Sequence, residues 1–127
     1  MAEASSPSWS QRARAGRDLA SLADAPEVAE ALVGLLLDAV NTAVTRQTAE
    51  ALAQVGTVAA VRLIALALAE ADDSHADWML TGLHDALAEP DSVPDISAVC
   101  GQLAQDPEEA VRRGAAEISA WAGDTRR

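Results

Sequence analysis

Carboxylates and one imidazole gather in residues 72–77, which read Asp-Asp-Ser-His-Ala-Asp and offer the oxygen and nitrogen ligands of a metal site. The same run is typical of a solvated helix N-terminus, where acids interact favourably with the positive end of the helix dipole. His84 lies nine residues after His75, which places the two rings on opposite sides of a helix. HExxH, paired-cysteine and EF-hand spacings are absent from the sequence. The pattern therefore favours a helix start, and we expect no metal and no cofactor.

A second set, His84 with Asp85 and Asp77, offers groups that exchange protons. Catalysis with such groups also needs a nucleophile or a phosphate-binding loop, and the sequence has neither a nucleophile motif nor a Gly-rich loop. Cys100, the only cysteine, stands at an apolar position of an expected helix, which indicates a small core residue rather than a reactive thiol. We therefore expect a protein that is not an enzyme.

Charge and composition narrow the choice of partner. The chain has 127 residues, a net charge of −11 and no lysine among its nine basic residues, a usage typical of bacterial genes rich in G and C. The acidic excess argues against nucleic acid and anionic membranes and favours a basic protein partner. A single cysteine, no secretory signal pattern and no long apolar stretch predict a cytoplasmic protein.

Half of the residues are hydrophobic, with no Phe and no Tyr, and many are alanine, so the composition favours helices over strands. We expect a single domain at 9–123, preceded by a disordered lead-in at 1–8 and followed by a flexible tail at 124–127. Seven helices are expected. The first four are residues 10–23, a helix from Pro26 with Asp24 as its cap, a helix capped by Asn41 or Thr42 and ended by Gly56, and residues 58–70 with Thr57 as the cap. The last three run from 72–74 to about 89, over about 95–105, and from 106–107 to just before Gly123.

Three stretches superimpose at the spacing of one helical repeat. They are residues 43–46, 77–80 and 110–113, and the steps from Val44 to Trp78 and from Trp78 to Val111 are 34 and 33 residues. Such a period is typical of stacked helical repeats. This register places Trp78 in the core. Trp9 and Trp121 come near the two ends, where they either cover the terminal repeats or anchor a partner or a second copy of the chain.

The repeat resembles the HEAT repeat. Residues 106–117 read Asp-Pro-Glu-Glu-Ala-Val-Arg-Arg-Gly-Ala-Ala-Glu, with an Asp, a Val-Arg pair five residues on, and a helix of small residues. Residues 37–56 are similar, with the Asp displaced by one, and the short period is similar to the compact HEAT-like units of phycobilin lyases. The resemblance covers 9–123. It implies an all-α fold, an α-solenoid of about seven helices in HEAT-like antiparallel helix pairs (an α-α superhelix).

The Asp–Arg ladder of such repeats is expected here only between Asp106 and Arg112, because Thr45 and Met79 replace the arginine in the other copies. That difference favours a compact right-handed bundle of helix hairpins over a long superhelix. The resemblance further implies that the first, third, fifth and seventh helices line a concave face. The outward positions beside their core stripes, a mixed-charge ridge with a hydrophobic centre, are Arg46, Glu50, Leu80, His84, Arg113 and Glu117.

A ridge of this kind suits a protein partner. The leading hypothesis is therefore a non-catalytic HEAT-like repeat protein that acts as a protein–protein interaction module or scaffold in a bacterial cell. An immunity or antitoxin-type protein that neutralises a basic toxin stays open, as does a homodimer. A HEAT-like enzyme such as a DNA glycosylase is disfavoured by the acidic charge and the lack of Phe and Tyr, and no residue for handling a chromophore supports a lyase.

Overall fold

The computed structural model describes residues 8–38, 41–88 and 96–125. Within these residues all regular structure is helical, which confirms the all-α prediction. The α-helices of the described part are α1 Trp9–Leu19, α2 Pro26–Leu36, α3 Thr42–Val55, α4 Val58–Glu70, α5 Asp73–Leu87, α6 Ile96–Leu103 and α7 Glu109–Thr125. A short 3-10 helix, Ala20–Leu22, extends α1.

Local capping signals set several helix ends as expected. Asn41 accepts a hydrogen bond from the Ala43 N–H at the start of α3, and Gly56 ends that helix with φ 68°. Thr57 caps α4 through the Ala60 N–H. These side chains or backbone conformations satisfy groups that a helix end leaves without an intrahelical partner.

Two expected ends are wrong. Ala25 rather than Asp24 precedes α2, because Pro26 fixes the first helical position and leaves Asp24 one residue too early to cap it. At the other end of the chain, α7 continues through Gly123 to Thr125, past the expected start of the tail. Residues 1–7 of the expected lead-in, the break at 90–94 and residues 126–127 of the tail lie outside the described residues.

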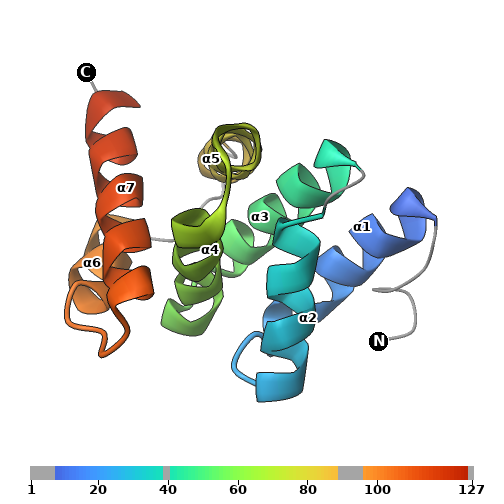
Figure 1. Cartoon of the computed structure of the whole chain (residues 1–127), viewed down its shortest axis with the longest axis horizontal. Helices are drawn as coiled ribbons and strands as arrows, with labels where there is room; N and C mark the ends of the chain where they lie inside the picture. Colours follow the sequence, from blue (N-terminus) through green and yellow to red (C-terminus); the bar gives the residue numbers. More distant parts are fainter. Residues whose placement is uncertain (1–7, 39–40, 89–95, 126–127) are drawn as a thin grey trace.

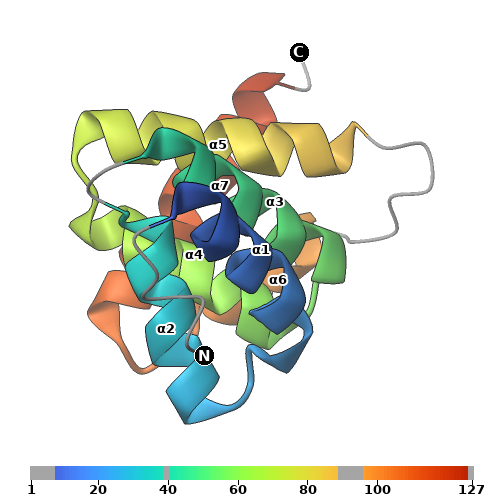
Figure 2. The ribbon, with the colours of Figure 1, turned by 90° about the vertical axis from the view of Figure 1, so that its right-hand side faces the viewer.

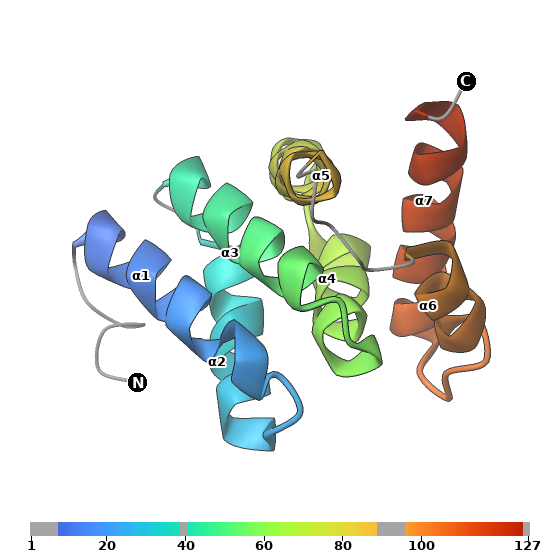
Figure 3. The same ribbon diagram turned by 180° about the vertical axis from the view of Figure 1, so that it is seen from behind.

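The helices pack with α3 and α4 at the centre. α3 packs against both α1 and α5, while α4 packs against α2, α6 and α7. Figure 1 shows α6 and α7 at one end of the molecule and α1 and α2 at the other. Figure 2 shows α5 lying over α3, and Figure 3 gives the same arrangement from behind. The main neighbour of α7 is thus α4, so α7 does not continue the row in which α1, α3 and α5 pack side by side.

Two glycines allow one helix to lie close to the backbone of another. A Cβ atom on Gly82 of α5 would overlap the Arg46 carbonyl oxygen of α3 and would lie 3.0 Å from the Ala49 Cβ. A Cβ atom on Gly114 of α7 would overlap the Ala65 carbonyl oxygen of α4 and would lie 2.6 Å from the Ala65 Cα. These glycines therefore hold α5 on α3 and α7 on α4 at a separation that any side chain would prevent.

The buried faces of α3, α5 and α7 confirm two of the three aligned positions as core and contradict the third. Val44 and Val111 are fully buried, and so is Met79. Trp78, expected in the core, is 39% exposed. One residue along a helix turns the side chain by about 100°. A shift of a single position therefore moves Met79 into the core and Trp78 out of it.

An ion pair beneath the surface joins α1 to the end of α2. The Arg12 Nε donates to the Asp38 carboxylate at 2.7 Å, and the two side chains are only 11% and 8% exposed. The other Asp38 carboxylate oxygen accepts the Asn41 N–H at 2.8 Å, just before α3. Asp38 thereby connects the three helices of the N-terminal end.

We predict that Gly114→Ala destabilises the protein by about 2–4 kcal/mol, because the α4 backbone at Ala65 has no room for a methyl group. Gly34→Ala is the matched control, since no atom lies within 4 Å of a Cβ at this exposed position of α2. It is expected to stabilise by about 0.5–1 kcal/mol through helix propensity. Urea unfolding followed by circular dichroism measures both. Equal effects of the two substitutions would contradict the α4–α7 contact.

We also predict that Arg12→Met costs about 3 kcal/mol, because it leaves the Asp38 carboxylate buried without its cation. Arg14→Met, on the exposed side of the same helix, is expected to change the free energy of unfolding by less than about 0.5 kcal/mol. The same urea titration compares them. If both variants unfold at the wild-type denaturant concentration, Asp38 does not depend on Arg12.

Candidate interaction surface

The acidic run at 72–77 forms the N-terminus of α5 and connects α5 to the end of α2. Asp72 is the N-cap of α5 and accepts the His75 N–H at 2.8 Å. The His75 ring lies between two acceptors, with Nδ1 2.8 Å from the Asp72 carboxylate and Nε2 2.7 Å from the Asp38 carbonyl oxygen. Among the described residues, no group of three or more His, Cys, Asp or Glu side chains is arranged to hold a metal ion.

Protonation of His75 strengthens this connection, because only the imidazolium donates hydrogen bonds from both ring nitrogens. The Asp38 carbonyl and then the Asp72 carboxylate raise the pKa of His75 above its ordinary value. The pKa of Asp72 is lowered, chiefly because its carboxylate accepts the His75 backbone N–H and also the ring. His75 therefore fixes the start of α5 to the end of α2.

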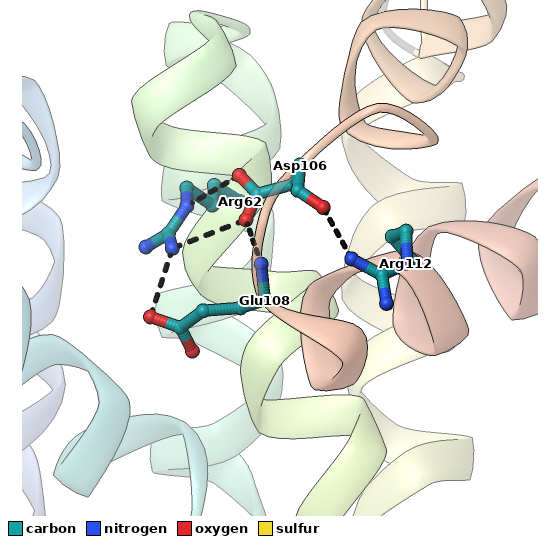
Figure 4. Close-up of polar contacts among 4 residues, drawn as sticks. All are labelled: Arg62, Asp106, Glu108 and Arg112. Atoms are coloured by element: carbon teal, nitrogen blue, oxygen red, sulfur yellow. Dashed lines mark hydrogen bonds and ion pairs between the residues drawn. The ribbon is translucent and has the colours of Figure 1, made fainter.

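A second ion cluster joins α4 to the loop before α7, as Figure 4 shows. The Arg62 Nε donates to the Asp106 carboxylate at 2.9 Å, and its Nη2 reaches Glu108 at 3.1 Å. The bond from Arg62 lowers the pKa of Asp106 and raises that of Arg62. Arg112, the expected ladder partner, donates instead to the Asp106 carbonyl oxygen at 2.6 Å. Arg62 interrupts an otherwise apolar helix, and that was the signal in the sequence for its role.

Cys100 is buried, which confirms its expected place in the core. Burial raises the pKa of its thiol, despite a hydrogen bond with Ser119 that acts in the opposite direction. The thiol is therefore protonated at neutral pH, and the thiolate that reactive cysteines need is disfavoured.

The six residues expected on the binding ridge lie on α3, α5 and α7, and each is at least partly exposed. Four of them line two separate grooves. Arg46 and Glu50 line a groove of about 410 Å³ along α1 and α3. Leu80 and His84 line a groove of about 320 Å³ between α5 and α7. The residues that line neither groove are Arg113 and Glu117, both on the exposed side of α7.

In the α1–α3 groove, both arginines already have hydrogen-bond or ion-pair partners. Arg46 contacts Asp85 at 3.0 Å and Glu50 at 3.8 Å, and Arg17 donates to the Gln47 side-chain oxygen. An incoming ligand would have to compete with these bonds for the same guanidinium groups. The two arginines of this groove are therefore less available to an incoming ligand.

The α5–α7 groove differs in that two large apolar side chains line it. Leu80 and Trp121 pack against the core and stay partly exposed, so they form an apolar floor. Asp77, Thr81 and the 65%-exposed His84 complete the lining. The Thr81 hydroxyl donates to the Asp77 carbonyl of its own helix at 2.9 Å, and this bond occupies its proton. The groove combines apolar surface with an acidic edge.

Outside the grooves, a few large apolar side chains face solvent. Trp9 is 47% exposed, whereas Trp121 is half-buried, so the two terminal tryptophans are not equivalent. Every helix in the described part of the chain is too short or too polar to cross a membrane.

Comparison with models of protein families, with curated proteins and with solved structures finds no match to this chain. Its function must therefore be inferred from the geometry and charge of its own surface.

We predict that the stability contributed by His75 declines as the pH rises. Because the folded-state pKa is raised, the contribution is complete below the ordinary value of about 6.5 and is lost as the pH passes through the raised value. His75→Gln should therefore destabilise the protein most at about pH 5.5 and progressively less towards about pH 8.5. Thermal unfolding across this range gives the comparison. His84→Gln, on the exposed side of the same helix, serves as control and should retain the wild-type pH profile.

Proposed function

We propose that this protein is a non-catalytic protein–protein interaction module or scaffold built from HEAT-like helix pairs in an α-solenoid. The observation that carries the proposal is the α5–α7 groove, where Leu80 and Trp121 stay partly exposed beside Asp77. Apolar floors with polar edges are typical of protein recognition sites, and aromatic residues contribute strongly to binding there.

A recurrent aspartate supports the HEAT-like repeat. Asp38, Asp72 and Asp106 stand 34 residues apart, each at the junction before an odd-numbered helix. Each carboxylate accepts a backbone N–H two or three residues on. Each also contacts a basic side chain, and these partners are Arg12, His75 and Arg62, in that order. Repetition of one device at a fixed step is what a repeat array requires.

The charge of the chain indicates the kind of partner. A net charge of −11 repels nucleic acid and favours a basic protein. The same charge favours a second candidate, an immunity or antitoxin-type protein that neutralises a basic toxin. A lone buried cysteine fits a reducing bacterial cytoplasm in either case.

Site-specific photo-crosslinking in the source cells tests the interaction function. The photoreactive residue p-benzoylphenylalanine replaces Thr81 in the α5–α7 groove or, as a control, Glu30 on the exposed side of α2. We expect one abundant protein adduct from position 81 and none from position 30, with the adduct identified by mass spectrometry. A secreted nuclease or other toxin as the adduct favours the immunity candidate. Absence of adducts at both positions, with the protein folded, contradicts an interaction module.

A further inference from the structure

Asp77 is the acid that lines the α5–α7 groove, and two further acids stand beyond its lining on α5 and α7. Asp73 and Asp77 share one face of α5 with Leu80 and His84, at helical spacings of four, three and four residues. On α7, Glu117 lies one turn before Trp121 on the same side of the helix. Arg113, one turn before Glu117, is a basic residue on the same side of α7.

The size of the groove limits what enters it. A volume of about 320 Å³ lies at the lower end of the range for ligand pockets and accommodates one or two side chains. The floor of Leu80 and Trp121 favours an apolar group, and Asp77 in the lining, with Asp73 and Glu117 beyond it, favours cationic neighbours. The groove arises because α7 packs on α4 and leaves its side facing α5 uncovered.

We propose that the α5–α7 groove binds an apolar side chain presented by a lysine- or arginine-rich segment of another protein. This inference rests on the proposed interaction function and names the chemistry of the partner. A second copy of this chain is a poor occupant, because it brings the same charge of −11 to an acidic groove. Nucleic acid and anionic lipid are disfavoured for the same electrostatic reason.

Intrinsic fluorescence tests the site directly. Trp9→Phe together with Trp78→Phe leaves Trp121 as the only tryptophan, and both replaced side chains are substantially exposed, so the fold should persist. The probe is a 12-residue amidated peptide, Lys-Lys-Leu repeated four times. We expect saturable binding with a blue shift of Trp121 emission, because the leucine side chain displaces water from the indole. The same peptide with serine for leucine should bind at least about tenfold more weakly.

Two charge variants of the single-tryptophan protein distinguish binding in the groove from non-specific electrostatic attraction of the peptide to the whole chain. Asp77→Asn removes an acid from the groove, and Asp18→Asn removes one from the exposed side of α1, at the other end of the molecule. Both change the net charge equally. We expect Asp77→Asn to raise the Kd about threefold and Asp18→Asn to leave it nearly unchanged.

The groove assignment is overturned by any of three results: no binding of the leucine peptide, binding without a change in Trp121 emission, or equal weakening by the two Asn substitutions. These outcomes test the chemistry of the groove; whether the protein binds a partner in cells is tested separately by the crosslinking experiment. A protein adduct from position 81 in cells, together with no response to the peptide, would mean that the partner contacts this groove through other chemistry.

Discussion

Close approach of helix backbones at small residues is the constraint on which this fold depends. With no Phe and no Tyr in the chain, the buried side chains are mostly Ala, Leu, Val and Ile. Gly82 and Gly114 instead bring α5 onto α3 and α7 onto α4, and fully buried alanines such as Ala49 and Ala65 complete these contacts. At these two contacts, dense packing comes from a short distance between helices rather than from large side chains.

The same constraint determines where the surface is open. α7 settles on α4 because Gly114 meets the backbone at Ala65, so α7 does not cover α5. Trp121 and Leu80 then remain partly exposed on facing helices, with Asp77 beside them. The groove is thus a consequence of how the last helix packs, and not of any motif within a single helix.

Electrostatics complement this packing at the helix junctions. An acidic chain gains stability when its carboxylates accept hydrogen bonds and contact the few basic side chains available. Asp38 and Asp106 use arginines from α1 and α4, and Asp72 uses His75, which also reaches the Asp38 carbonyl. Many of the remaining acids face solvent, where they influence encounter with charged partners more than they influence the fold.

Sequence alone determined the helical class, the bounds of α4, the caps at Asn41 and Thr57 and the stop at Gly56, because these depend on composition and on contacts within a few residues. It also placed Leu80 and His84 among the exposed residues of α5. Sequence did not determine which face of α5 is buried, since Met79 rather than its neighbour Trp78 lies in the core. Nor did it determine that Arg62 pairs with Asp106, 44 positions away. Only the tertiary structure decided that α7 lies on α4, since the choice between neighbouring helices depends on backbone separation at Gly114. No local pattern encodes that separation.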